Sequence, residues 1–534
     1  MKIAITALAC ALPAMVSVAL DRPATPATYR AVLGQLAPGD RMLLAAGTYE
    51  GLPITSLSGA AGMPIIITGP ESGAPAIIGA RSCCNTVSIR NSAYVTLRHV
   101  EIDGRGELVD AIKAEGDAMF AHHITIEHVR MHSFGNDQQI VGISTKCPAW
   151  DWVIRSVTID RPGTGLYLGD STGDAPFVRG LIENNLIVDA IGYDAQIKHQ
   201  NPRPATAGMP TADSVTIIRD NVFVKATRAS TGDEARPNLL VGHWPVSGPG
   251  QNDRYEIYGN YFHENASLTE ALFQGEGNVA FHDNVLFNSL GPGLLFRAQN
   301  GEVRDVSVYN NTIYAFGRGI AISGGAAGTT QPVVGNAVFA SSPTPIQGGA
   351  QSDNFETTLG LTEQFVVSAR APLDFYPRAG TTLEGSAIDL TPFSNHVDFD
   401  RDFNGTPKTR RFRGAYSGSG TNPGWALAQA IKTRATVSVS DAGPSLTDVM
   451  LVGIEPDAAM DASVEAQPDA RVIAPVDDAG VRAADAGVRA DDAAAADMAS
   501  RRVTGSCACT GTREDLAGGM VLLLAAMFVA RRRG

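Results

Sequence analysis

Short stretches of alternating apolar and polar residues recur along the chain, and many of them end just before an asparagine. Residues 215–223 and 255–262 show the pattern most clearly, each with an Asn followed by two apolar residues. The asparagines at the equivalent position are Asn185, Asn221, Asn260, Asn284, Asn311 and Asn336. Successive members lie 24 to 39 residues apart, and no helical period intervenes. Strand periodicity repeated at such an interval predicts a solenoid of short strands.

We interpret this solenoid as an all-β, right-handed parallel β-helix. In such a fold each coil adds strands ~4.8 Å from those of the coil before it. An Asn at the corner between two strands can occupy a left-handed turn and bond the Asn of the next coil. The asparagines are therefore expected to be structural, with no chemical role.

A second set of four-residue segments supplies another strand to each coil. Their first and third residues are apolar and are expected to point inward, whereas the second and fourth face solvent. The expected first outward column is Lys113, Ser144, Tyr167, Gln196, Leu240, Leu272, Leu295 and Ala321. The expected second column is Glu115, Lys146, Gly169, Lys198, Gly242, Gln274, Arg297 and Ser323. A solenoid face of this kind is suited to binding a polymer.

The two ends of this region resemble those of pectate-lyase-like β-helix proteins. Residues 37–50 are similar to their first coil, and residues 398–416 are similar to their terminal cap. The resemblance spans about 30–425 and implies the fold. It does not imply an activity, since that fold hosts lyases, hydrolases, epimerases, adhesins and binding proteins.

Three cations on the second outward column suggest a ligand. Lys146 and Arg297 are expected ~10 and ~14 Å from Lys198, a spread that suits the successive carboxylates of a uronic-acid chain. β-Elimination of such a chain needs a base and a cation or metal that stabilises the enolate. A lysine flanked by cations can be that base, because its pKa falls. Other candidate binding residues cluster near the same coils: Asp194, Gln196, His199, Arg236, His243, Trp244, Gln274 and Glu276.

The arrangement is similar to the alginate lyase and chondroitinase B family. That resemblance implies Lys198 as the base, with His243 and an arginine beside it. Gly242 stands where the family has this arginine, so Arg297 or Arg236 would have to replace it. The resemblance also implies calcium bound by an acid pair, but only Asp194 of that pair is acidic, because Gln196 occupies the other position. Glu276 is the other candidate for a metal ligand.

Two functions therefore remain open: a lyase acting on acidic polysaccharide, and a non-catalytic glycan-binding or adhesion module that uses the same face. Individual residues leave similar alternatives. Lys198 is either a base or a solvated surface lysine. Trp244 either stacks on a sugar ring or covers the core. Arg297 either binds substrate or pairs with Glu276.

Three further motifs have structural interpretations. Cys83, Cys84 and Cys147 allow at most one disulfide, expected between Cys147 and one of the vicinal pair. The acidic run 398–405 has calcium-loop features but is expected to form a capping turn. Strand alternation is expected to separate the ring directions of His122 and His123, and no HExxH metal motif is present.

Charge and composition indicate how the chain is divided outside the β-helix. Most of the formal charge of −13 comes from residues 441–500, which hold thirteen acids and three arginines. The rest of the chain is close to neutral, so a strongly basic nucleic-acid binder is excluded. We predict a signal peptide at 1–19, the β-helix domain at 21–430, a disordered acidic tether at 436–503 and a sorting tail at 504–534.

The tail resembles the MYXO-CTERM type of myxobacterial surface proteins. It combines Cys507 and Cys509 with a short apolar stretch, 516–530, and an arginine cluster, Arg531, Arg532 and Arg533. The resemblance implies export, processing near Cys507 and display at, or release from, the cell surface. The expected partners are an acidic polysaccharide and the export machinery, with no nucleic acid and with membrane contact only through the tail.

Overall fold

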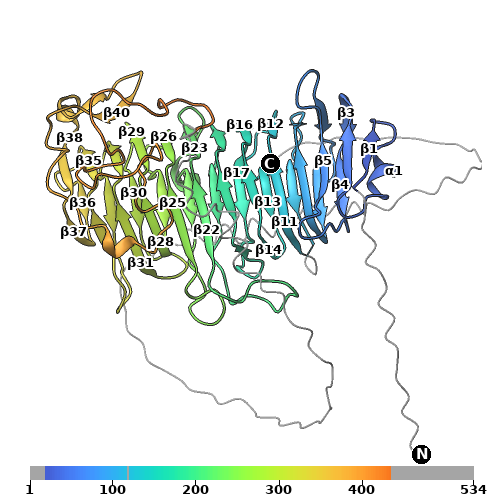
Figure 1. Cartoon of the computed structure of the whole chain (residues 1–534), viewed down its shortest axis with the longest axis horizontal. Coiled ribbons are helices and arrows are strands. Elements are labelled where there is room, and N and C mark those ends of the chain that lie inside the picture. The colour runs from blue at the N-terminus through green and yellow to red at the C-terminus, as the bar shows by residue number, and fades with distance from the viewer. Residues whose placement is uncertain (1–18, 117–119, 434–534) are drawn as a thin grey trace, which may run out of the picture. The chain divides into compact units, whose positions relative to one another are not determined.

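The structure, a computed structural model, describes residues 19–116 and 120–433 (Figure 1). Three long parallel sheets wind around one axis, and most coils give one strand to each sheet. This confirms the predicted parallel β-helix. Two antiparallel strands, β39 (Val366–Ser368) and β40 (Asp374–Pro377), follow the last coil. Short helical turns are α1 (Tyr29–Leu33), η1 (Gly232–Glu234), η2 (Leu359–Gln364) and η3 (Thr391–Phe393).

Sheet A begins each coil. Its strands are β1 (Asp21–Ala24), β2 (Arg41–Leu44), β5 (Ile65–Thr68), β8 (Ser92–Arg98), β11 (Ala121–Glu127), β14 (Ala149–Trp150), β15 (Val153–Arg155), β18 (Phe177–Val178), β19 (Leu181–Glu183), β22 (Val215–Arg219), β25 (Arg254–Tyr258), β28 (Gly277–His282), β31 (Val303–Tyr309), β34 (Pro332–Val334) and β37 (Ala350–Ser352).

Sheet B follows the asparagine corner. Its strands are β3 (Gly47–Glu50), β6 (Ala76–Gly79), β9 (Val100–Asp103), β12 (Arg130–His132), β16 (Thr158–Asp160), β20 (Leu186–Val188), β23 (Val222–Lys225), β26 (Tyr261–Asn265), β29 (Val285–Asn288), β32 (Thr312–Ala315), β35 (Ala337–Ala340) and β38 (Phe355–Thr358).

Sheet C closes each coil. Its strands are β4 (Leu52–Thr55), β7 (Val87–Arg90), β10 (Ile112–Ala114), β13 (Val141–Thr145), β17 (Thr164–Leu168), β21 (Ala195–Ile197), β24 (Leu239–Val241), β27 (Phe273–Gly275), β30 (Leu294–Phe296), β33 (Ile320–Ile322) and β36 (Ile346–Gln347).

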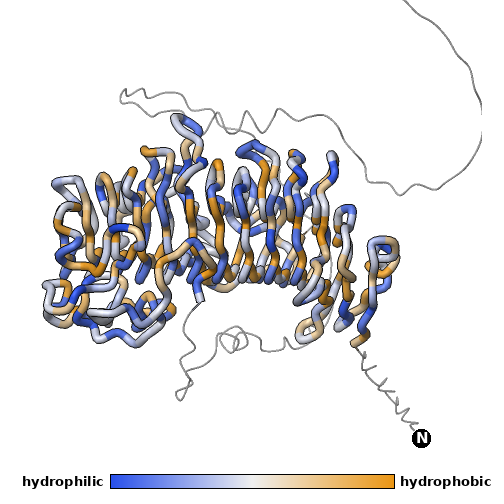
Figure 2. Tube along the Cα trace, turned by 90° about the horizontal axis from the view of Figure 1, so that it is seen from above, coloured by the Kyte–Doolittle hydropathy of each residue, from blue (hydrophilic) through white to orange (hydrophobic). Residues whose placement is uncertain are grey.

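Inward-pointing apolar side chains from the three sheets form one continuous core. In sheet C, for example, Ile143, Leu166, Leu239 and Phe273 are completely buried, as the alternation predicted. Figure 2 shows hydrophobic residues recurring from coil to coil along the stack. Within the described ranges no helix is long and apolar enough to cross a membrane. The predicted apolar stretch at 516–530 lies outside those ranges.

The predicted asparagine ladder is present. Each side-chain amide donates to the next Asn Oδ1 at 2.9–3.1 Å, from Asn185 through Asn336. Asn354, which the sequence pattern did not include, continues the ladder at 3.0 Å. The left-handed corner residue is the one before each Asn, for example Asp283 at φ 52°. The asparagine side chains therefore bond one coil to the next, and the residue before each asparagine makes the left-handed turn.

The outer face of sheet B is covered from β20 onward by the C-terminal segment 359–433. Outward side chains of sheet B such as Val224, Tyr261 and Phe339 form a second apolar cluster with Phe375 and Tyr416. The acidic run 398–405 forms the expected capping turn, because the Asp402 carboxylate accepts backbone N–H groups of Asn404, Thr406 and Ser417. Burying this apolar face fixes the segment on the solenoid.

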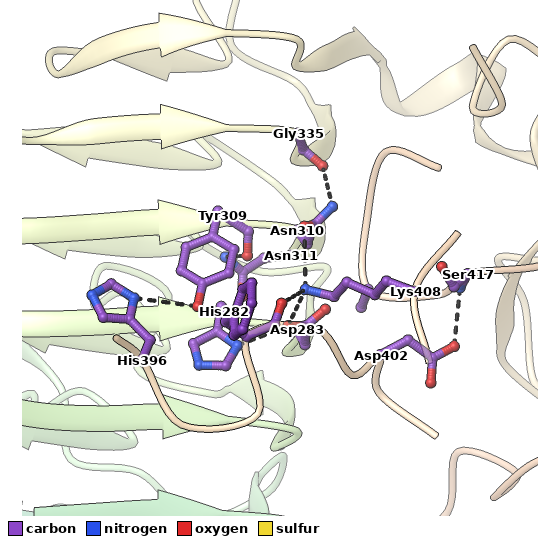
Figure 3. A network of polar contacts seen from close by, with 12 residues as sticks. His282, Asp283, Tyr309, Asn310, Asn311, Gly335, His396, Asp402, Lys408 and Ser417 are labelled. Atoms are coloured by element: carbon purple, nitrogen blue, oxygen red, sulfur yellow. Dashed lines mark hydrogen bonds and ion pairs between the residues drawn. The ribbon is translucent and has the colours of Figure 1, made fainter. Parts of the chain in front are cut away.

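Buried lysines attach the same segment to the corner column. Lys408 Nζ lies 2.7 Å from Asp283 Oδ2, and the network around this pair joins the segment to Asn310 and Tyr309 (Figure 3). Lys432 Nζ donates to Asp220 Oδ1 at 2.8 Å and to Gly259 O. The segment thus contacts corner residues of several successive coils.

One expected side-chain direction is wrong. His123 has a left-handed backbone (φ 52°), so the strand alternation is interrupted and its ring meets that of His122. The two Nδ1 atoms are 2.7 Å apart. His123 Nε2 lies 3.3 Å from Asp151, whose carboxylate also pairs with Arg179.

Candidate functional site

Sheet C presents the outward columns that the sequence predicted between β10 and β24. Lys113 pairs in register with Ser144, Ser144 with Tyr167, Tyr167 with Gln196, and Gln196 with Leu240. The second apolar cluster, which includes the C-terminal segment, packs on the outer face of sheet B and not on sheet C. The outer face of sheet C is therefore the long face on which chemistry can be placed.

The expected register is wrong by two residues at β27. Gln274 pairs with Leu240 and Leu295, so it occupies the first column, and Leu272 lies buried in the preceding turn. Glu276 then takes the second column, between Gly242 and Arg297. A two-residue slip keeps Phe273 inward and Gln274 outward, as predicted, so alternation could not detect it. The expected outward direction of Leu272 is wrong, because this residue precedes the strand and packs in the core.

The side chain of Lys146 packs against an aromatic ring on this face. Its Nζ lies 3.2 Å from the centroid of the Tyr167 ring, one coil further along. Burial, together with the charges of Lys113 and Lys198, lowers the pKa of Lys146 to about 7. The charges of Asp110 and Asp170 oppose this shift without cancelling it. A substantial fraction of Lys146 is therefore an uncharged amine at neutral pH.

Asp170 and Tyr167 complete this centre, which we call the Lys146 centre (Lys113, Lys146, Tyr167, Asp170 and Lys198). Burial alone would raise the pKa of Asp170, but hydrogen bonds from Thr172 and two backbone N–H groups lower it. Burial also raises the pKa of Tyr167, so its phenol stays protonated. Asp170 had no sequence signal beyond its place directly after Gly169 of the second column.

His199 and His243 lie on the next coils, with their rings stacked 5.4 Å apart. Burial lowers the pKa of His199, and the neighbouring Lys198 and His243 add to the effect. His243 Nδ1 lies 2.8 Å from Trp244 O, so in the neutral ring Nδ1 carries the proton and Nε2 is the acceptor. These two imidazoles are adjacent to Lys198 and are able to accept protons or bind hydroxyl groups.

Three predicted binding residues serve the fold. Trp244 is 1% exposed and stacks on Tyr255 at 4.2 Å, so it covers the core and cannot present its face to a sugar. The Glu276 carboxylate accepts the backbone N–H groups of residues 299–301 and fixes that loop. Gln274 donates to Gln299 in the same loop.

The acids expected to bind calcium do not fit a metal. Asp194 is completely buried, and burial raises its pKa well above the usual value despite the opposing charge of Lys225. Glu276 already accepts three backbone amides, and Gln196 is buried beside Tyr167 in the first column. In the part of the chain that the structure describes, no three His, Cys, Asp or Glu residues converge as metal ligands. No step is therefore assigned to calcium.

The two candidate arginines lie apart from Lys198. Arg236 is held in the turn before β24, where its Nη1 donates to the carbonyls of Asp233 and Ala235. Its guanidinium lies 5.9 Å from the Tyr193 ring centroid. Arg297 follows β30 at the edge of a separate pocket that also contains Arg318.

The expected disulfide of Cys147 is not formed. Cys147 is a buried thiol, and burial followed by the charge of Glu115 raises its pKa to about 12. Cys83 and Cys84 are near the surface with their sulfurs 3.8 Å apart, beyond a covalent bond. Cys507 and Cys509 lie outside the described residues, as do Arg531, Arg532 and Arg533.

Comparison with known proteins gives distant structural likenesses only. No family model matches the chain, and no curated protein matches it. A lacto-N-biosidase of the GH136 family from Eubacterium ramulus superposes with a TM-score of 0.47 at 11% identity, covering 64% of this chain and 68% of that one. An alginate lyase from Paenibacillus sp. str. FPU-7 gives 0.32 at 15%, covering 63% and 95%. Pectate lyase Pel9A gives 0.32 at 16%, covering 81% and 96%.

Proposed function

We propose that this protein binds an acidic polysaccharide along sheet C and cleaves it by β-elimination, with Lys146 as the base. The observation on which this rests is the Lys146 centre, where a lysine amine lies against a tyrosine ring between two further lysines. A base that is poised near neutral pH, beside a protonated phenol, is an arrangement suited to general acid–base catalysis. The expected base, Lys198, becomes a neighbour of the reacting group.

The reaction would proceed as follows. The uncharged Lys146 amine removes the proton α to the uronate carboxylate, at C5. The electron pair left on C5 forms the C4–C5 double bond as the C4–O bond breaks. The leaving oxygen takes the proton of the Tyr167 phenol, and proton transfer from the Lys146 ammonium to the tyrosinate restores both groups. Lys113 and Lys198 would stabilise the negative charge that develops on the carboxylate.

An assay on the full chain tests this proposal. Alginate, pectate, chondroitin and hyaluronan would each be incubated with the protein, and the ultraviolet absorbance of the new double bond followed. We expect one polymer to give a rise that Lys146→Gln and Tyr167→Phe reduce ~10²-fold or more. Arg370→Gln, a change at a highly exposed cap residue, should leave the rate unchanged. A flat trace for all four polymers would exclude elimination of these substrates.

A non-catalytic glycan-binding or adhesion module is the second candidate. Two observations favour it: Gly242 leaves the coil after Lys198 without a cation, and Asp194 is buried away from the face. On this alternative the same polymers would co-sediment with the protein without being cleaved. Lys146→Gln would then weaken binding by the value of one contact and would change no reaction rate.

Export and surface display remain part of this proposal. Most of the signal peptide at 1–19, the whole of the tether at 436–503 and the whole of the tail at 504–534 lie outside the described residues. Their compositions support secretion, tail processing near Cys507 and a position at the cell surface. Fractionation of producing cells, with mass analysis of the mature N- and C-termini, would test each step. Uncleaved protein in the cytoplasm would contradict export.

A further inference from the structure

A pocket of about 250 Å³ opens where the turns before β27, β30 and β33 meet the outer face of sheet C. Glu270 and Thr269 precede β27, and Arg318 precedes β33. Arg297 reaches the pocket from the end of β30. Leu295 and Ala321, both outward residues of the first column, form an apolar wall.

The two arginines of this pocket differ from most others in the described residues. Most arginines there pair with a carboxylate or donate to a carbonyl, for example Arg219 with Glu183 and Arg155 with Glu127. The described ranges contain neither a hydrogen bond nor an ion pair from the guanidinium of Arg297 or Arg318. The Nε of Arg318 is in addition buried and has no hydrogen-bond partner. A buried donor without a partner costs free energy that a ligand oxygen would recover.

The charge balance of the pocket favours an anion. Arg297 and Arg318 outnumber the single carboxylate, Glu270. Burial raises the pKa of Glu270, while the charges of Arg297, Lys225 and Arg236 oppose that rise. Two planar guanidiniums suit bidentate recognition of a carboxylate, and the apolar wall suits one face of a pyranose ring.

The size of the pocket limits the ligand. At about 250 Å³ it is below the volume of most sites for drug-sized ligands. Arg297 also lies five coil steps from Lys146 along sheet C, which corresponds to roughly 24 Å. A single sugar residue of a chain that runs along the solenoid could therefore enter this pocket while another part of the chain lies at Lys146.

We propose that Arg297 and Arg318 form a subsite that binds one carboxylated sugar residue, with the carboxylate between the guanidiniums and the ring against Leu295 and Ala321. That the ligand is part of a polymer rests on the proposed function. The recognition of a uronate is argued from the residues of the pocket alone. Glu270 would limit the affinity by repelling the carboxylate.

Binding of glucuronate and galacturonate to the full chain, with glucose as the neutral control, tests the subsite. Calorimetry or ligand-observed NMR should show uronate binding and no comparable glucose binding. Arg318→Gln and Arg297→Gln should each weaken uronate binding about tenfold or more, as expected for one charge-assisted contact. Glu270→Gln should tighten it, and Arg370→Gln should leave it unchanged. Equal binding of glucose, or uronate binding unaffected by both arginine changes, would overturn the proposal.

The subsite and the proposed reaction can fail separately. Lys146→Gln should reduce elimination ~10²-fold or more and leave uronate binding at Arg318 intact. Uronate binding without turnover of any polymer would support the subsite and reject the lyase. Turnover whose product lengths do not respond to Arg318→Gln, together with absent uronate binding, would reject the subsite alone. Circular dichroism of each variant would confirm that the β-helix is folded.

Discussion

The ammonium group of Lys408 lies 2.7 Å from the carboxylate of Asp283, although 125 residues separate them in the chain. Both side chains are almost completely buried, and the ammonium also donates to Phe399 O at 2.9 Å. His282 Nδ1 lies 2.7 Å from the same Asp283 oxygen (Figure 3). The pair therefore joins the C-terminal segment to the left-handed corner of the solenoid.

Removing one partner of this pair should destabilise the protein more than removing both. Lys408→Met leaves a buried Asp283 carboxylate without its cation, and we expect a loss of about 3–5 kcal/mol in unfolding free energy. Adding Asp283→Asn, which suits a left-handed position, should recover part of that loss. Urea unfolding and limited proteolysis of the C-terminal segment measure the effect. A double variant no more stable than Lys408→Met would contradict the ion-pair explanation.

The asparagine ladder predicts a second pattern of stability. Asn284 donates its amide to Asn311 Oδ1 and Ile257 O and accepts from the backbone and side chain of Asn260. Asn284→Asp keeps the shape but removes both donors and buries a charge, so it should cost at least about 2 kcal/mol. Asn136→Asp is a matched control, because the Asn136 oxygen already faces Arg228 and the change should be nearly neutral. Equal effects at the two positions would contradict a structural role for the ladder.

The fold was predictable because it repeats. From Asn185 onward each coil presents the same alternation and the same asparagine, so one template identified strands from 180 to 340, whereas earlier coils have a valine there, for example Val157. Asn354 was missed because the sheet A strand before it, β37, lacks the apolar residues of the template. The two-residue shift in register at Glu276 was missed for a different reason. Such a shift keeps the alternation of inward and outward positions within the strand, which is all that the template uses.

The candidate site was less predictable because it depends on burial and on distant contacts. Lys146 was recognised as an outward cation, but its lowered pKa results from the Tyr167 ring and the surrounding coils. Trp244 was left between two roles, since sequence does not show whether an insertion folds back on the core. No pattern links Lys432 to Asp220, which lies 212 residues earlier.

Cys147 should be a free and unreactive thiol. Burial raises its pKa to about 12, so little thiolate forms near neutral pH, whereas Cys83 is exposed. We expect iodoacetamide to label Cys83 quickly and Cys147 only after unfolding in guanidinium. Peptide mapping without reduction would detect the alternative, a peptide linking Cys147 to Cys83 or Cys84.

Acid should destabilise the protein through His122. Its ring lies between Phe120 and Trp150, and burial followed by the charge of His123 lowers its pKa from 6.5 to about 4. The unfolded chain therefore binds a proton that the folded chain excludes as the pH falls from about 6.5 to about 4. This difference removes up to about 3 kcal/mol over that window and nothing above it. His122→Gln should flatten the pH dependence of urea unfolding below pH 6.5, and an unchanged slope would contradict this assignment.

The pH profile of elimination should report the Lys146 amine directly. Because the base must be uncharged, the rate should fall as the pH drops below about 7, the lowered pKa of Lys146. Lys146→Arg should be inactive across the range, since a guanidinium stays protonated. Lys198→Gln removes one of the cations that lower this pKa, so the acid limb of kcat should move to higher pH. A residue that only bound substrate would change KM and leave that limb in place. An acid limb of kcat that Lys198→Gln does not move would therefore reject Lys146 as the base.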